Sequence, residues 1–222
     1  MAGLYYFQED YDIDQTTHLG SAFCPLTGAI NPAFAAICAA SAQANAAPSQ
    51  FKQQADSLAV FFQGTYHVTE QFGLTARVRY SDDNKDGSFL VESNNAIASG
   101  FLAATENHQL EFADDQVIWL ANAKYFVDED IMAFFTVSTG YKSGGLNSVM
   151  TRGGLTAEQR LFDSEDVKSY ELGIKSTLLD GRMIANATVF RTDIDNFQDR
   201  SFQDLVFVIT RKLALSRCRN RR

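Results

Sequence analysis

The chain has 222 residues, of which 45% are hydrophobic and 21% charged, and its 19 basic and 27 acidic side chains give a formal net charge of −8. This balance argues against a nucleic-acid-binding protein, because phosphate backbones require a basic surface. The longest uninterrupted apolar run, Ala33 to Ala40, is too short for a helix that spans a bilayer. No basic-then-apolar signal-peptide pattern follows Met1. These facts leave open a membrane protein built from strands.

Seven stretches of the chain alternate between apolar and polar residues with a period of two. They lie at residues 4–13, 58–68, 72–81, 117–127, 131–141, 170–178 and 183–197. In the third, the alternating apolar positions are Phe72, Leu74, Ala76, Val78 and Tyr80. A period of two places successive side chains on opposite faces of a strand. The pattern predicts an all-β protein of about seven strands, each with one apolar and one more polar face.

The connections between these strands alternate in length. Residues 69–71, 128–130 and 179–182 are short, and the last of them contains the Asp180-Gly181 pair that favours a tight hairpin turn. Residues 14–51, 82–114 and 145–164 are long. A transmembrane barrel has short periplasmic turns at one end and long extracellular loops at the other. We therefore expect an antiparallel up-and-down transmembrane β-barrel, with about seven to eight of its strands present.

Aromatic residues stand at both ends of the apolar stretches. Tyr66, Phe72 and Tyr125 flank the short turns, whereas Tyr80 and Tyr141 lie towards the long loops. Amphipathic rings favour the two headgroup regions of a bilayer. Strands in general also favour aromatic residues, so it is the joint pattern that indicates a membrane.

The first long loop contains two cysteines and a helix signal. Asn31-Pro32 followed by Ala33 to Ala42 predicts an N-cap and a short helix. If this loop faces the oxidising cell exterior, we expect a disulfide between Cys24 and Cys38, the alternative being two unpaired thiols. Cys218 receives no role.

No motif in the sequence predicts catalysis or a metal site. The run Asp82, Asp83, Asn84 and Asp86 before Gly87 resembles the start of a calcium loop, but the acid expected at the twelfth position is missing. A solvated strand exit explains these residues better. The three histidines lack metal-ligand spacing, and no phosphate-binding or nucleophile pattern is present. We expect no enzyme activity, no catalytic residues, no metal and no cofactor.

Several segments together resemble TonB-dependent receptors. The strand-to-loop motif Gly140-Tyr141-Lys142-Ser143-Gly144-Gly145 is similar to one of that family. So are the segment EDVKSYELGIKS from Glu165, the LLDGR turn after it, and the strand NATVFRTDIDNFQ. GLYYF from Gly3 and FGLTARVRYSDD from Phe72 resemble other barrel strands of the family. The resemblance covers nearly the whole chain to about residue 210.

The resemblance implies an outer-membrane receptor of a Gram-negative bacterium. Such receptors import scarce nutrients, typically ferric siderophores, with energy from the TonB complex. Their barrels have about 22 strands and enclose a plug domain. In this sequence no plug and no TonB-contacting segment precede Gly3, and only about seven strands are present. We therefore expect an internal fragment, with residues 1–210 as a partial barrel that contacts outer-membrane lipid.

The last twelve residues differ from the rest, because residues 211–222 hold six basic residues and no acidic one. We interpret them as an anomalous tail that replaces the expected continuation of the barrel. A basic tail can also be a nucleic-acid or membrane arm. The fragment as a whole is expected to bind no nucleic acid.

Four basic residues are expected on the lumen side of the barrel: Arg77, Arg79, Lys142 and Lys175. They either attract an anionic ligand such as a siderophore carboxylate or form ordinary pairs with neighbouring acids. The main alternative function is a small closed outer-membrane barrel with a porin-like or structural role, using an eighth strand near residues 202–210. A soluble β-sheet binding module is a further alternative, which the alternating loop lengths argue against.

Overall fold

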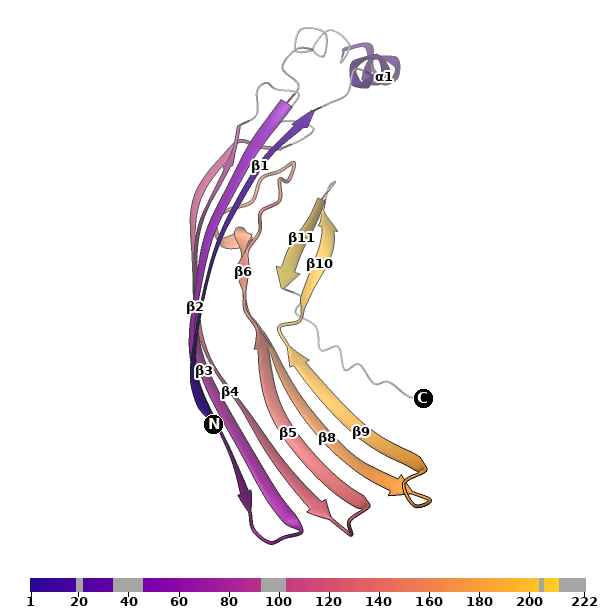
Figure 1. The fold of residues 1–222 in the computed structure, drawn as a ribbon. Coiled ribbons are helices and arrows are strands. Elements are labelled where there is room, and N and C mark those ends of the chain that lie inside the picture. The colour runs from indigo at the N-terminus through magenta and orange to yellow at the C-terminus, as the bar shows by residue number, and fades with distance from the viewer. Residues whose placement is uncertain (19–21, 34–45, 93–102, 204–205, 212–222) are drawn as a thin grey trace.

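A computed structural model describes residues 1–18, 22–33, 46–92, 103–203 and 206–211 (Figure 1). Seven strands form one antiparallel sheet, and their order across the sheet is the same as their order along the chain. They are β1 (Ala2–His18), β2 (Ala46–His67), β3 (Phe72–Val91), β4 (Glu106–Phe126), β5 (Ile131–Lys142), β8 (Glu165–Leu178) and β9 (Met183–Asp195). The predicted all-β, antiparallel architecture is confirmed. Within the described part of the chain, no helix has the length and hydropathy needed to cross a membrane.

The remaining elements are short. They are α1 (Phe23–Ile30), β6 (Gly145–Leu146), the 3₁₀ turn η1 (Glu158–Arg160), β7 (Leu161–Phe162), β10 (Gln198–Gln203) and β11 (Val206–Arg211). The sequence did not predict α1. Asn31 accepts a hydrogen bond from the backbone N–H of Ala33 (3.0 Å), as an N-cap residue does. Most of the helix expected after it lies outside the described residues.

The sheet is strongly curved, and its two ends differ as the loop lengths predicted (Figure 1). The short β2–β3, β4–β5 and β8–β9 turns lie together at one end, and α1 lies at the other. In the β8–β9 turn, Leu179, Asp180 and Gly181 all have positive φ angles, which the Asp-Gly pair tolerates. Residues 143–164, here called the inner segment, connect β5 to β8 and carry β6, η1 and β7 on the concave side.

The strands are longer than the sequence analysis predicted. β3 continues past residue 81 to Val91, and β4 begins at Glu106 instead of near residue 117. Asp82, Asp83, Asn84 and Asp86 therefore lie within a strand, and the predicted strand exit at these residues is wrong. A strand crosses a bilayer with roughly 9–11 residues, so strands of about twice that length extend beyond it.

The apolar side of the sheet changes along each long strand. Near the short turns, even-numbered residues of β2 and β3 are apolar and exposed on the convex face, with Val60 49% and Tyr66 70% exposed. In the far half, the buried apolar residues of β2 and β3 are odd-numbered and lie on the concave face. There the inner segment covers the buried cluster, which consists of Phe51, Phe89, Val91, Ala103, Leu110 and Leu146.

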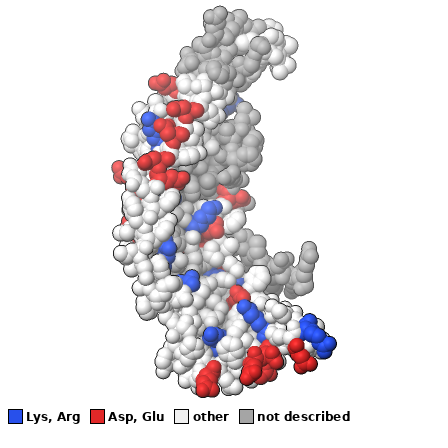
Figure 2. Space-filling model, viewed as in Figure 1, with Lys and Arg blue, Asp and Glu red and all other residues white. Residues whose placement is uncertain are grey.

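The convex face becomes acidic where it stops being apolar. The register places the following residues on that face of the first four strands: Asp10, Asp12, Asp14, Asp56, Asp82, Asp86, Glu111 and Asp115. Along the convex edge in Figure 2, acidic side chains gather in the upper part and at the lower rim, with a mostly white band between. This order of polar, apolar and polar zones is what a membrane-spanning strand requires.

The expected eighth strand does not join the large sheet. Residues 206–211 form β11, which pairs with β10 in a separate two-stranded sheet. Among the described residues, β1 and β9 each have one edge without a partner strand. The tail expected at residues 211–222 lies outside the described residues except for Arg211, where β11 ends.

Candidate functional site

The concave face is basic in the half near the short turns. The register places Arg77 and Arg79 of β3 on the same face as the buried cluster. Lys124 of β4 and Lys175 of β8 lie on this face too. Among the described concave positions of this half, only Glu171 is acidic. The face therefore carries an excess of positive charge.

These cations are not neutralised by carboxylates. Among the described residues, none of the four forms an ion pair within 4.0 Å. Arg77 donates through Nε to Oε1 of Gln63 (2.8 Å). The Arg79 guanidinium lies 5.0 Å from the centre of the Tyr5 ring. Neutral partners orient the two arginines without cancelling their charge, so their field extends over the concave face.

The Gly140–Gly145 motif carries the chain from the sheet to its concave side. Pairing of β5 with β4 ends at Ser138, and the Tyr141 hydroxyl donates to Oδ2 of Asp83 on the concave face (2.8 Å). Burial raises the pKa of this hydroxyl, and Asp83 adds to the rise. The expectation that Tyr141 marks a membrane interface is therefore wrong, because β5 turns inward once it has left β4.

Polar side chains from distant strands clamp the end of the motif. Lys85 of β3 donates to Oγ of Ser143 (3.1 Å) and to the carbonyl oxygen of Gly144. The backbone N–H of Gly144 donates to Oγ of Ser164 (2.9 Å), whose hydroxyl donates to Asp114 of β4. Burial lowers the pKa of Lys85, while nearby carboxylates oppose this effect. The clamp joins both ends of the inner segment to the sheet.

Lys142 lies apart from the other predicted basic residues. Its side chain is exposed, and its carbonyl oxygen accepts a hydrogen bond from Nε2 of Gln198 (3.3 Å). The same amide donates to the carbonyl of Ser143 (3.2 Å). The structure therefore brings Arg77, Arg79 and Lys175 to one half of the concave face and places Lys142 where the inner segment begins.

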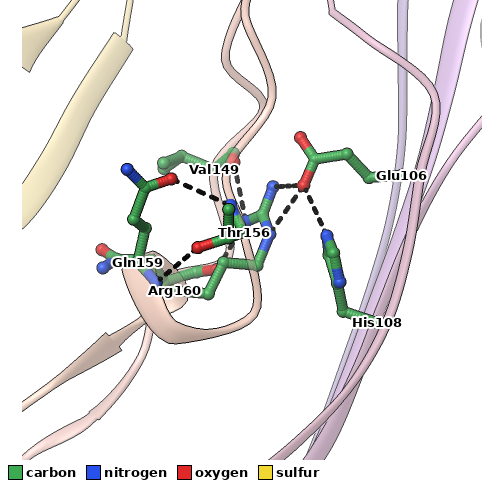
Figure 3. A network of polar contacts seen from close by, with 7 residues as sticks. Glu106, His108, Val149, Thr156, Gln159 and Arg160 are labelled. Carbon is green, nitrogen blue, oxygen red and sulfur yellow. Dashed lines mark hydrogen bonds and ion pairs between the residues drawn. The ribbon is translucent and has the colours of Figure 1, made fainter.

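A buried ion pair fixes the inner segment to β4 (Figure 3). Arg160 of η1 is fully buried and donates to Oε2 of Glu106 through Nε (2.9 Å) and NH2 (2.6 Å). Its NH1 donates to the carbonyl oxygens of Asn147 (2.9 Å) and Val149 (3.1 Å). The guanidinium lies 3.4 Å from the centre of the Phe89 ring. Arg160 thus links the inner segment to itself and to the sheet.

Three buried polar atoms at or near this ion pair have no hydrogen-bond partner among the described residues. The buried atoms Oε1 of Glu106, Nε2 of His108 and Oγ1 of Thr151 make no hydrogen bond with the described residues. His108 Nε2 lies 3.2 Å from Oε2 of Glu106, within ion-pair distance but without hydrogen-bond geometry. Each unsatisfied buried polar group costs about 1–3 kcal/mol, so the network opposes part of the stability that the ion pair supplies.

Of the two cysteines in the predicted loop disulfide, only Cys24 belongs to the described residues. Cys24, in α1, is disulfide-bonded. Cys38 lies outside the described residues, so its pairing with Cys24 stays a prediction.

Sequence reasoning missed Arg160, Glu106 and Lys85. One local signal was available, because Thr156 and Gln159 form a capping box that begins η1. Nothing local indicates the partner of Arg160, since Glu106 is 54 residues away in the sequence.

Comparison with known proteins identifies relatives of the chain. It is 28% identical over 144 residues to the pesticin receptor of Yersinia pestis, covering 65% of this chain and 20% of the receptor. It is 24% identical over 156 residues to a catecholate siderophore receptor of Escherichia coli O6:H1, covering 64% of this chain and 20% of that protein. The chain thus spans about a fifth of the length of the curated relatives it matches.

Solved structures agree on the fold. The ferric yersiniabactin uptake receptor of Yersinia pestis matches with a TM-score of 0.59 and 28% identity, over 68% of this chain and 22% of the receptor. The closed form of a ferric-catecholate import receptor of Escherichia coli K12 matches with a TM-score of 0.53 and 17% identity, over 72% of this chain and 24% of that one. A family model described as "TonB dependent receptor-like, beta-barrel" matches residues 3–212. The chain belongs to this family of receptor barrels.

Proposed function

We propose that the chain forms part of the barrel wall of an outer-membrane receptor that takes up a ferric siderophore with energy from the TonB complex. The observation that carries the proposal is the half of the concave face near the short turns, where the described positions hold four cations and a single acid. The named relatives support it, since they are receptors for pesticin and for catecholate siderophores. The role is transport and not catalysis.

The open edges of the sheet support the view that further strands complete the barrel. Among the described residues, the outer edges of β1 and β9 have no partner strand. In lipid, each unsatisfied backbone group costs several kcal/mol. We therefore propose that residues 1–210 are a partial barrel, and that further polypeptide supplies the remaining strands, a plug and the TonB contact.

The basic concave face suits an anionic cargo. Arg77 and Arg79 carry charge that the described carboxylates do not pair. A cleft lined by one sign of charge raises the local concentration of the opposite sign. We propose that these arginines and Lys175 attract the carboxylates or catecholates of a siderophore as it passes the wall.

A small closed barrel with a porin-like or structural role is less well supported. Closure would need β9 to pair with β1 directly or through an eighth strand. The segment expected to supply that strand, β11, pairs with β10 instead.

Uptake is tested with the full polypeptide that carries this chain, expressed in cells lacking their own siderophore receptors. We expect accumulation of radiolabelled ferric siderophore that stops when the proton gradient is collapsed. Replacing Arg77 and Arg79 together by Gln should slow uptake at low ionic strength by about tenfold, with less effect in high salt.

The matched control is Arg191→Gln. Arg191 is exposed, lies on the opposite face of the sheet and pairs with Asp193 (2.9 Å). Uptake unchanged by the Arg77 and Arg79 substitutions would refute the role of the basic face. Energy-independent leakage of unrelated solutes would instead favour the porin-like alternative.

A further inference from the structure

Among the described residues, the inner segment supplies a single buried apolar side chain to the cluster that it covers. Leu146 belongs to the buried cluster, and Met150 and Ala157 pack against it. The Leu146 side chain sits so close to Gly87 that a Cβ there would lie 2.6 Å from its Cδ1 atom. The segment's own regular structure is limited to the two-residue strands β6 and β7 and the turn η1. Regions with few buried apolar contacts are those that open locally.

One side chain, Arg160, forms a polar attachment between the middle of the segment and the sheet. It reaches Glu106 on the sheet and also holds two carbonyl groups of its own segment, as Figure 3 shows. Its contact with the Phe89 ring brings the same cation onto the apolar cluster. Removing Arg160 would therefore abolish this middle attachment to β4 and leave Glu106 as an unpaired buried charge.

The closed arrangement is incompletely satisfied. Oε1 of Glu106, Nε2 of His108 and Oγ1 of Thr151 are buried and have no hydrogen-bond partner among the residues that the structure describes. Opening the segment would give these three atoms access to water. A buried ion pair also loses its hydration, which the attraction between the charges offsets only in part. These costs oppose the contacts of Arg160 and the covered apolar cluster, which hold the segment closed.

The ends of the segment are held differently from its middle. Lys85 bonds to Ser143 and Gly144, and Ser164 joins Gly144 to Asp114. This clamp does not involve Arg160. The middle of the segment can therefore leave the sheet while its two ends stay attached.

From these observations we infer that the inner segment is a strap that opens as a unit, with the Arg160–Glu106 pair as its latch and the Lys85 clamp as its base. Opening uncovers the buried cluster around Phe89, and with it the Glu106 carboxylate, on the concave face while the seven-stranded sheet stays intact. The inference concerns a movement within this chain and does not depend on the identity of any cargo.

Hydrogen exchange tests the latch in the full polypeptide in detergent micelles. Two strap amides are reporters. The N–H of Asn147 donates to the carbonyl oxygen of Arg160 (2.7 Å), and the N–H of Arg160 donates to the carbonyl oxygen of Thr156 (3.1 Å). Both bonds depend on the position of Arg160, so both amides should exchange when Arg160 leaves Glu106. In the unaltered protein, we expect strap amides to exchange together and about tenfold or more faster than those in the middle of β3 and β4. Arg160→Met should accelerate the strap amides by a further tenfold or so and leave the sheet unchanged.

The matched control is Arg191→Met, which removes an exposed arginine from an exposed ion pair and should leave the strap unchanged. Glu106→Gln is the second latch variant, since it keeps the shape and an acceptor oxygen, and it should accelerate the same amides less than Arg160→Met. If Arg160→Met fails to fold, the exchange rates of strap and sheet amides in Glu106→Gln and in the unaltered protein still test the inference. Strap and sheet amides that exchange at the same rate, or that accelerate equally in a latch variant, would overturn the inference.

Discussion

At the scale of single residues, Gly144 sets the path by which the chain leaves the sheet. A Cβ at this position would clash with the carbonyl oxygen of Phe162 and lie 2.5 Å from Cζ of Phe112. The backbone of Gly144 is also held from both sides by the Lys85 clamp. The residue therefore has no room to move away from an added methyl group.

We expect Gly144→Ala to lower the free energy of unfolding by about 1–3 kcal/mol, because an overpacked site forces its neighbours to shift. Urea unfolding in detergent micelles, followed through the fluorescence of Trp119, measures the change. The control is Gly140→Ala in the same motif, since a Cβ there meets nothing within 4 Å. Equal losses in the two variants would show that the close contact at Gly144 is unimportant.

Asp166 gives a prediction about pH. It lies directly opposite Asp195 across β8 and β9. Partial desolvation of this largely exposed carboxyl, with the charges of Asp114 and Asp195, raises its pKa above the usual 3.8. A carboxyl with a raised pKa binds its proton more tightly in the folded state. Its contribution to stability is therefore greatest below pH 3.8 and is lost as the pH rises through the folded-state pKa.

Asp166→Asn should accordingly raise the free energy of unfolding at neutral pH by about 0.5 kcal/mol, a small value because the side chain is exposed and like charges are screened. The gain should disappear below pH 3.8. Urea unfolding of both proteins across this pH range checks the prediction. A gain that persists in acid would mean that charge is not its cause.

At the scale of elements, each long strand has a lipid-facing zone and a zone beyond the membrane. Within the lipid-facing zone, only one face of the sheet meets lipid, and two adjacent residues of β5 show this. The register aligns Val137 with Ala121 on the convex face, whereas Ser138 points to the concave face beside Leu120. Only the first of these two side chains would meet lipid.

Val137→Arg should lower the free energy of unfolding in lipid vesicles by about 2–4 kcal/mol, the cost of a basic side chain on the lipid face near the midplane. Ser138→Arg should cost much less, because it faces the polar side. Urea titration in vesicles measures both changes. If the concave variant were the more damaging, the assignment of faces would be reversed.

At the scale of the whole molecule, the open edges of the sheet determine how the chain behaves alone. Among the described residues, β1 and β9 lack partners on their outer sides. All described residues of β9 are exposed except Asp193, which is half-buried. Half of the backbone groups in such an edge strand point away from the sheet.

For the isolated chain in micelles, we therefore expect alternate amides of β1 and β9 to exchange about a hundredfold faster than those of β3. In the full polypeptide that carries the chain, neighbouring strands should remove this difference. Hydrogen exchange measured on both forms makes the comparison. Edges that stay unprotected in the full polypeptide would contradict the proposal that further strands complete the barrel.

Local patterns in the sequence were sufficient for most of the fold. The alternation of Phe72, Leu74 and Ala76 with polar residues identified a strand and its lipid-facing side, because the period of two is a property of the strand itself. The short turns were equally local, as Asp180 and Gly181 show by their positive φ angles. Seven strands and the two unlike ends of the sheet followed from these signals.

The far halves of the strands were missed because the apolar residues there change face. Asp82 and Asp86 continue the convex face of β3, while Phe89 and Val91 are covered from the concave side. An apolar residue on that side is explained only by the inner segment, which comes more than 50 residues later in the chain. The lengths of these strands could therefore not be predicted from local sequence patterns.

By itself, the sequence determined the strand order, the turns and the lipid-facing zone, since each depends on residues close together in the chain. Only the tertiary structure decided that Tyr141 turns inward to Asp83 and that Arg160 meets Glu106. Both contacts join residues more than 50 positions apart. They form because the sheet is curved and its concave side is filled by a segment of the same chain, a condition that no local pattern of residues records.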